Sequence, residues 1–216
     1  MASTYSSDLK LELVTTGEKA GLWGTITNTN LQILQQSSSG YLALAVGGSD
    51  VTLSLDNGAT SNGKNLYIKL TGTLTANRTV TMPASAERVF IIEDATVRGT
   101  SNRTLSVLTA SGTALPISVG ATMLVKSDGT NTTKGITQKG YNTITDSNTP
   151  YTAIAADQIL ANTTANPITI LLPASPVTGD EVTIIDTRGT WGSNNCIINR
   201  NGNPINSGTA NLTLNT

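Results

Sequence analysis

An internal repeat constrains the fold more than any other feature of the sequence. The phrase TLTANRTVTMPAS at residues 73–85 returns about ninety residues later as NTTANPITILLPAS at residues 162–175. Later pieces of the two copies also match, and they comprise Ile91-Ile92 with Ile184-Ile185, Asp94 with Asp186, and the Arg-Gly-Thr triplets at 98–100 and 188–190. A chain that repeats a phrase of this length contains two copies of one module, and such modules build length by stacking. We therefore expect a rod.

Both copies have the pattern of β-structure. Their apolar runs are short, rich in Val, Ile and Thr, and separated by turn-forming Gly, Asn, Asp and Ser. In the first copy the runs are YLALAV, VTLSL, NLYIKL, RTVTM, VFIIED, TLSVLT, LPISV and ATMLVKS. In the second copy they are YTAIAA, QILANTT, ITILLP, EVTIID, CIINRN and LTLN. Short strands at regular spacing predict a mainly β chain with two repeated β-sandwich-like modules.

The repeat divides the chain into four parts. We expect an N-terminal docking or trimerisation element at residues 1–40, a first β module at 41–131, a polar linker at 132–150 and a second β module at 151–216. The second copy has no counterpart of ATMLVKSDGTN, the phrase that closes the first copy. Two explanations stay open for the missing strand. Either the chain continues beyond residue 216, which we favour, or a neighbouring chain supplies it.

The N-terminal part combines a predicted strand and a predicted helix. Residues 8–14, DLKLELV, alternate between polar and apolar, which places Leu9, Leu11 and Leu13 on one face of a strand. After glycine-rich turns, the absence of Gly and Pro predicts a helix from about Thr25 to Gln36 that ends at residue 40. Thr and Asn form helices weakly, so this helix needs a partner, and the same helix in another copy of the chain would provide one.

Composition excludes several classes of function. The sequence has no His, which removes the Ser-His-Asp triad and the commonest zinc ligand. The single cysteine, Cys196, cannot form an intrachain disulfide, and its strand-like surroundings predict a buried, inert thiol. Charged residues make up 12% of the chain and the net charge is -1, so no field attracts nucleic acid. We also find no signal-peptide pattern and no apolar run of about 20 residues. We expect no cofactor, no metal and no membrane insertion.

The N-terminal phrase carries a resemblance to a known family. YSSDLKLELVTTGEKAGLWGTITNTNLQIL resembles the N-terminal segment of tail-fibre-like virion proteins of marine tailed bacteriophages, especially those of cyanobacteria. The residues that fit are Gly17, Glu18, Ala20, Gly21, Trp23, Gly24, Thr27, Asn28, Asn30 and Leu31. The later phrases GTLTANRTVTMPAS and TILLPASPVTGDEVTIID are similar to the β modules that follow in such proteins.

This resemblance implies a non-enzymatic structural protein of the virion. It implies an intertwined homotrimer that is made in the host cytoplasm and assembled into the phage tail. The N-terminus would dock on tail, baseplate or adaptor proteins, and the chain would reach a host surface receptor only indirectly. As alternatives we keep a fibre or decoration protein attached to the capsid or neck, and an adhesin that binds or cleaves host polysaccharide.

Candidate contact residues lie in the N-terminal element. The hypothesis of partner docking or trimer contact covers Gly21, Trp23, Gly24, Asn28, Asn30, Leu31, Ile33 and Leu34. Trp23 would either anchor the chain in a tail protein or close the N-terminal core. Asn28 and Asn30 would cap a helix or bond across a trimer axis. Gly21 and Gly24 would serve backbone geometry or close approach.

The acidic residues allow an enzymatic and a structural interpretation. Glu93-Asp94 and Asp180-Glu181 with Asp186 provide carboxylates of the kind that glycosidases use in pairs. However, Asp94 and Asp186 occupy equivalent positions in the repeat, so a turn cap, or ion pairs with Arg98 and Arg188, explains both. We therefore assign no catalytic residue. The tyrosines, at positions 5, 41, 67, 141 and 151, are scattered and predict no stacking platform.

Overall fold

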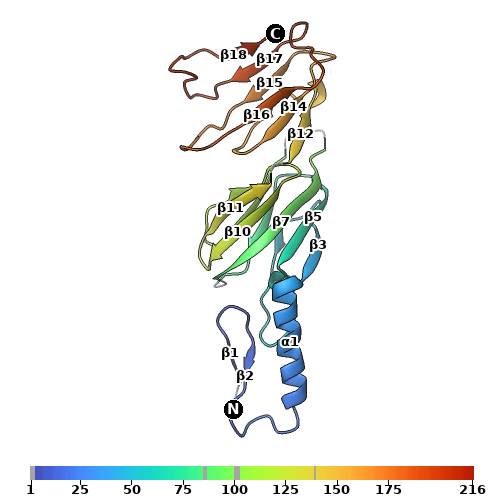
Figure 1. Cartoon of the computed structure of the whole chain (residues 1–216), viewed down its shortest axis with the longest axis vertical. Helices are drawn as coiled ribbons and strands as arrows, with labels where there is room; N and C mark the ends of the chain where they lie inside the picture. The colour runs from blue at the N-terminus through green and yellow to red at the C-terminus, as the bar shows by residue number, and fades with distance from the viewer. Residues whose placement is uncertain (1–2, 85–86, 100–102, 139) are drawn as a thin grey trace.

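The protein is a rod of three parts in a row. The computed structural model describes residues 3–84, 87–99, 103–138 and 140–216, so the repeat positions Ser85 and Thr100 lie outside the described residues. Figure 1 shows a hairpin and a helix at one end of the molecule and two β modules stacked along its long axis, with the two termini toward opposite ends. The expected rod-like arrangement of repeated modules is therefore present.

The N-terminal part consists of a hairpin and a helix. Strand β1 (Thr4–Tyr5) pairs antiparallel with β2 (Glu12–Leu13), and α1 spans Trp23–Ser39. The predicted strand at residues 8–14 is confirmed only at Glu12–Leu13, because the chain turns before them and Lys10 has a φ of 56°. The helix is longer than predicted at both ends. It ends at Gly40 as expected, and there a Cβ would lie 2.2 Å from the Gln36 carbonyl oxygen.

In the first module the chain alternates between two sheets, adding one strand to each in turn. In one sheet, β3 (Tyr41–Ala45), β5 (Tyr67–Thr73) and β7 (Glu87–Val97) run parallel. In the other, β4 (Val51–Thr52), β6 (Arg78–Met82) and β8 (Leu105–Thr109) run parallel. A 3₁₀ turn, η1 (Asn62–Lys64), connects β4 to β5. Three antiparallel strands close the module: β9 (Leu115–Pro116) pairs with β8, β10 (Thr122–Asp128) pairs with β7, and β11 (Thr132–Gln138) pairs with β10.

The second module repeats this winding. Strands β12 (Tyr141–Ile144), β14 (Gln158–Ala161) and β16 (Thr183–Asp186) form one parallel sheet. Strands β13 (Tyr151–Thr152), β15 (Ile168–Leu171) and β17 (Cys196–Asn199) form the other, which the antiparallel β18 (Leu212–Leu214) extends. A 3₁₀ turn, η2 (Asp146–Asn148), connects β12 to β13.

Two parts of the predicted architecture need correction. The modules resemble a β-solenoid more than a β-sandwich, since successive turns of the chain stack in parallel. The interval 132–150 is not a linker, because it contains β11 and β12. Its polar appearance has a physical cause. Strand β11 lies at the edge of its sheet, and Thr is a good strand former that does not need burial.

Each module has its own hydrophobic core. Inward side chains alternate with outward ones along the strands, as in β5, where Ile68 and Leu70 are fully buried. The first core includes Phe90 from β7 and Val125 from β10. The second core is smaller and consists of Ile144, Tyr151, Ala153, Ile159, Ala161, Ile168, Ile170, Cys196 and Ile198.

Candidate functional site

One face of α1 carries an exposed apolar stripe. Trp23, Leu31 and Leu34 are 55%, 57% and 42% exposed. At 100° per residue, these three side chains fall within about 80° of arc on the helix. A large apolar surface of this kind on a lone helix is typical of an interaction site. The stripe, defined by these three residues, is the strongest candidate docking surface of the N-terminal part.

The adjoining face of α1 packs within the chain. Ile26 and Ile33 are buried there, so the prediction that Ile33 contacts another copy was wrong. The sequence pattern could not separate Ile33 from Leu34, because the burial of Ile33 depends on tertiary contacts of the helix. The same helix also holds the first module, since the Gln36 amide donates to the Ser61 carbonyl and accepts from the Ser61 N–H.

Asn30 fastens the hairpin to the helix. Its side-chain oxygen accepts from the Glu12 N–H at 3.0 Å, and its amide donates to the Glu12 carbonyl at 2.9 Å. The amide thus pairs with β2 as another strand would. The predicted capping role of Asn28 and Asn30 was wrong, because both residues lie inside the helix rather than at its start. Asn28 is exposed and, within the described residues, its side chain has no hydrogen-bond partner.

We expect the substitution Asn30→Leu to release the hairpin. It removes both hydrogen bonds to Glu12 and leaves a part-buried N–H and carbonyl without partners, at a cost of about 1–3 kcal/mol each. Hydrogen exchange measured by mass spectrometry should show faster exchange across residues 3–14, with the two β modules unchanged. Asn28→Leu is the matched control, and it should leave exchange in the hairpin as it is. Equal effects of the two variants would contradict this role of Asn30.

The glycines around Trp23 have different roles. Gly21 lies in the turn before the helix with a φ of 79°, a conformation that favours glycine. Gly24 lies in the first turn of the helix, where an added Cβ would meet no atom within 4 Å. Trp23 is the first residue of α1 and is exposed, so the alternative in which it closes an N-terminal core was wrong.

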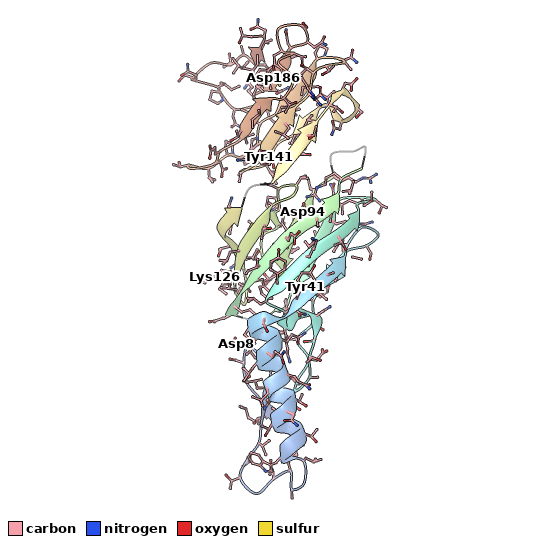
Figure 2. The ribbon with its side chains drawn as sticks, turned by 45° about the vertical axis from the view of Figure 1, so that its right-hand side comes forward. Asp8, Tyr41, Asp94, Lys126, Tyr141 and Asp186 are labelled. Atoms are coloured by element: carbon pink, nitrogen blue, oxygen red, sulfur yellow. The ribbon has the colours of Figure 1, made fainter. Side chains whose placement is uncertain are left out.

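Asp94 and Arg98 form a buried ion pair at the end of the first module. The guanidinium lies 2.5 Å from Asp94 Oδ2 and also donates to the carbonyl of Ile117 and to Thr96 Oγ1. The Asp94 side chain is fully buried. Burial raises the pKa of Asp94 above its ordinary value, although Arg98 and the hydrogen bonds from Thr96 oppose the shift. Figure 2 shows Asp94 at the end of the first module that faces the second.

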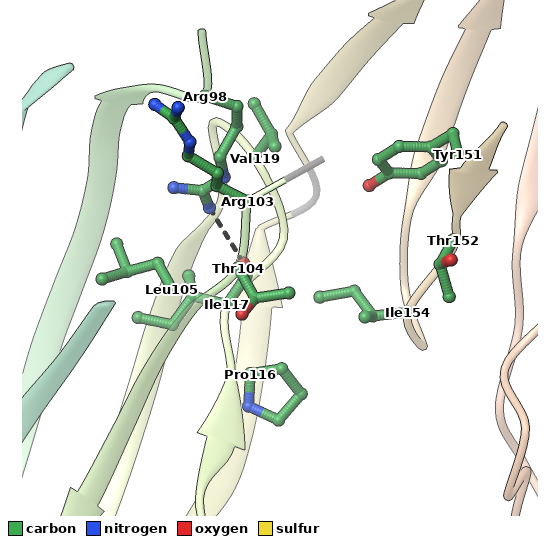
Figure 3. A pocket seen from close by; sticks show the side chains of 10 residues that line it. All are labelled: Arg98, Arg103, Thr104, Leu105, Pro116, Ile117, Val119, Tyr151, Thr152 and Ile154. Atoms are coloured by element: carbon green, nitrogen blue, oxygen red, sulfur yellow. Dashed lines mark hydrogen bonds between the residues drawn. The ribbon is translucent and has the colours of Figure 1, made fainter. Parts of the chain in front are cut away.

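The two modules meet around a small cavity beside this pair. The cavity has a volume of about 80 Å³, and Figure 3 shows Arg98 and Ile117 of the first module on one side and Tyr151 and Ile154 of the second on the other. Tyr151 Oη donates to Asp157 Oδ2 at 2.8 Å, and burial raises the pKa of both groups. Buried polar groups therefore lie on both sides of the contact between the modules.

Asp186, the counterpart of Asp94, is used differently. Its carboxylate accepts the N–H groups of four successive residues, which are Arg188, Gly189, Thr190 and Trp191. Burial acts to raise the pKa of Asp186, but these four donors together lower it. Of the two structural roles considered for the acids, Asp94 has the ion pair and Asp186 has the turn cap. In the described residues no side-chain ion pair joins Asp186 to Arg188.

Contacts within the chain engage four of the acidic residues considered for glycoside hydrolysis, which are Glu93, Asp94, Asp180 and Asp186. Glu93 and Asp94 are adjacent in β7, so their side chains point to opposite faces of the sheet. Glu93 binds Tyr67 and Lys69 on the outer face, each at 2.8 Å. Asp180 accepts from the Val177 N–H within its own loop.

Two tyrosines come together although the sequence shows them as scattered. Tyr41 and Tyr67 stack with their ring centroids 5.6 Å apart, and Tyr41 is largely exposed. The parallel register of β3 and β5 places them opposite each other. The sequence did not predict this contact, because the two tyrosines are far apart in the chain and meet only through the pairing of β3 with β5.

The remaining predicted features concern the thiol, metals and membranes. Cys196 is buried in β17 as predicted, and burial, with the nearby Asp186 charge, raises the pKa of its thiol to about 11. Among the described residues, no cluster of His, Cys, Asp and Glu is arranged to hold a metal ion. The described residues also contain no helix with the length and apolar character that crossing a membrane requires.

Comparisons with protein-family models, with curated proteins and with solved structures find no match for this chain.

Proposed function

We propose that this chain is a non-enzymatic structural protein of a bacteriophage virion, forming the tail-attached shaft of a fibre that supports host adsorption. The observation that carries the proposal is the axial order of its parts. A helix with an unpartnered apolar stripe lies at one end, and two modules of the same winding extend from it in a row. Stacked modules of this kind give length and stiffness, which a fibre needs to hold its tip at a distance.

The helix is proposed to join three copies of the chain. Trp23, Leu31 and Leu34 would face the same residues of two neighbouring helices and bury apolar surface that a single chain leaves in water. Threefold association rests on the resemblance of residues 5–34 to phage tail-fibre proteins. The hairpin held by Asn30 would then lie beside the stripe, at the margin of the bundle, within reach of a docking protein of the tail.

The mass of the chain in solution tests this assembly. We expect static light scattering to give three times the chain mass of 22.4 kDa. The double variant Leu31→Glu, Leu34→Glu should reduce the mass to that of one chain, because six buried carboxylates would repel one another in the bundle. The control variant Gln32→Glu, Gln35→Glu adds the same charge to exposed helix positions outside the stripe and should remain trimeric. If the unmodified chain has the mass of a monomer, the proposal of a trimeric shaft is wrong.

Location on the virion separates the tail fibre from its alternatives. Antibodies against the chain, imaged by electron microscopy on whole virions, should label the tail. Label on the capsid or neck would support the fibre or decoration protein instead. The polysaccharide-binding alternative draws on the exposed Tyr41–Tyr67 stack, and binding of host glycan that is lost in Tyr41→Ala would favour it.

A further inference from the structure

The outer face of the first module's five-stranded sheet carries a row of apolar side chains that crosses four strands. Its members lie side by side in register, and they are Tyr41 of β3, Tyr67 of β5, Ile91 of β7 and Leu124 of β10. We call these four residues the apolar row. Tyr41 is largely exposed, and the other three side chains are partly exposed. Val89 and Val97, at the two ends of β7, are exposed on the same face.

The two sheets of the first module differ in their outer faces. Strands that are covered on both faces are apolar at successive positions, whereas strands with one face in water alternate. Strand β7 reads VFII at residues 89–92, and β10 reads MLV at residues 123–125. In the other sheet, β6 (RTVTM) and β8 (LSVLT) alternate, and their outward side chains are Thr79, Thr81, Ser106 and Leu108. Of these two sheets, the first therefore has the pattern of a sheet that is covered on both sides.

Two charged groups beside the apolar row are paired with each other. Lys69 Nζ lies 2.8 Å from Glu93 Oε1, and Tyr67 Oη donates to Glu93 Oε2 at 2.8 Å. A molecule that covers this network buries no unpaired charge, so it avoids the main cost of burying ionised groups. Lys126, the next outward residue of β10 after the row, is exposed, and its long side chain can keep the ammonium group in water.

The stripe on α1 is too small to hold copies of the chain together by itself. Burying a whole aromatic side chain removes about 150–250 Å² from water, and the three side chains of the stripe are only about half exposed. They therefore provide at most about 400 Å² for each chain. A stable interface buries about 800 Å² on each partner. Copies that meet at α1 must also touch elsewhere.

We propose that a second copy of this chain covers the apolar row, so that copies lie against each other along the first module as well as at α1. This inference rests on the proposed association through the helix. Only Gly40 separates α1 from Tyr41, and Figure 2 shows Tyr41 where the helix meets the first module. Copies joined at the helix therefore hold their first sheets within reach of one another. The stacked rings of Tyr41 and Tyr67 supply large apolar contacts of the kind that dominate interfaces.

Charges placed in the apolar row test the interface on the full chain. In the double variant Ile91→Glu, Leu124→Glu, two carboxylates lie opposite each other on the outer face of β7 and β10. We expect sedimentation equilibrium to show that the protein concentration at which half of the trimer dissociates rises by about 100-fold or more. The control variant Thr81→Glu, Leu108→Glu places the same pair on the outer face of β6 and β8, and it should change that concentration by less than about threefold. Equal effects of the two variants would overturn the proposal.

Hydroxyl-radical footprinting tests the same face without a substitution in the sheet. The unmodified chain is compared with the monomeric variant Leu31→Glu, Leu34→Glu, and the oxidation of single residues is read by mass spectrometry. Tyr41 is 59% exposed in one chain, so a covering copy should lower its oxidation by about threefold or more. Leu108, on the outer face of the other sheet, is the internal control and should react equally in both samples.

The outcomes separate this interface from the proposed function. A monomeric unmodified chain would overturn both. A trimer in which Tyr41 reacts as fast as in the monomeric variant would overturn only the interface, and association through α1 would stand. If Tyr41 becomes protected only when purified polysaccharide of the host surface is added, the face binds glycan, and the proposed contact between copies is wrong.

Discussion

Arg98→Met is expected to destabilise the first module by about 3–5 kcal/mol at neutral pH, because it leaves the buried carboxylate of Asp94 without its counter-ion. The methionine keeps most of the apolar bulk of the arginine side chain, so the loss comes mainly from charge. Chemical denaturation followed by circular dichroism would measure it. The double variant Asp94→Asn, Arg98→Met should recover a large part of the loss, since it no longer buries an unpaired charge.

The pH dependence of this variant identifies the cause. Burial raises the folded-state pKa of Asp94 above its unfolded value, and the loss of Arg98 raises it further. A carboxyl group with a raised folded pKa is penalised above that pKa and carries no penalty once it is protonated in both states. The deficit of Arg98→Met relative to the unmodified chain should therefore be largest at neutral pH and shrink as the pH falls toward about 4. A deficit that does not change with pH would point to lost packing instead.

The strands could be predicted from the sequence, but their arrangement could not. Runs such as Leu105–Thr109 alternate with period two, and the repeat marks corresponding strands in the two modules. The same alternation arises whether neighbouring strands are parallel or antiparallel, so it did not separate a sandwich from a solenoid-like winding. The repeat nevertheless revealed that the second module has no counterpart of β10, and the structure places that difference at the edge of β16.

The candidate residues, like the strands, could be predicted from the sequence only in part. The absence of Gly and Pro indicated α1, yet only the fold separates the exposed Leu34 from the buried Ile33. The equivalence of Asp94 and Asp186 was visible in the repeat, but their different bonding depends on whether an arginine reaches the carboxylate. Asn30 gave no signal of its role, because its partner Glu12 is distant in sequence and is contacted through backbone atoms.

Strand β10 should contribute more to the stability of the first module than its position among the last strands of that module implies. Val125 is fully buried against Phe90, whereas its neighbour Lys126 points to solvent. Val125→Asp places an unpaired charge in the core, and we expect a loss of about 4 kcal/mol or more, comparable to the whole stability of many domains.

Lys126→Asp introduces the same residue one position along the strand and should change the stability by less than about 0.5 kcal/mol. Hydrogen exchange would locate the damage, because the two cores are separate. With Val125→Asp, β5 and β7 should lose protection while β14 and β15 keep theirs. Equal loss in both modules would show that they unfold together. The second module would then depend on the first for its stability.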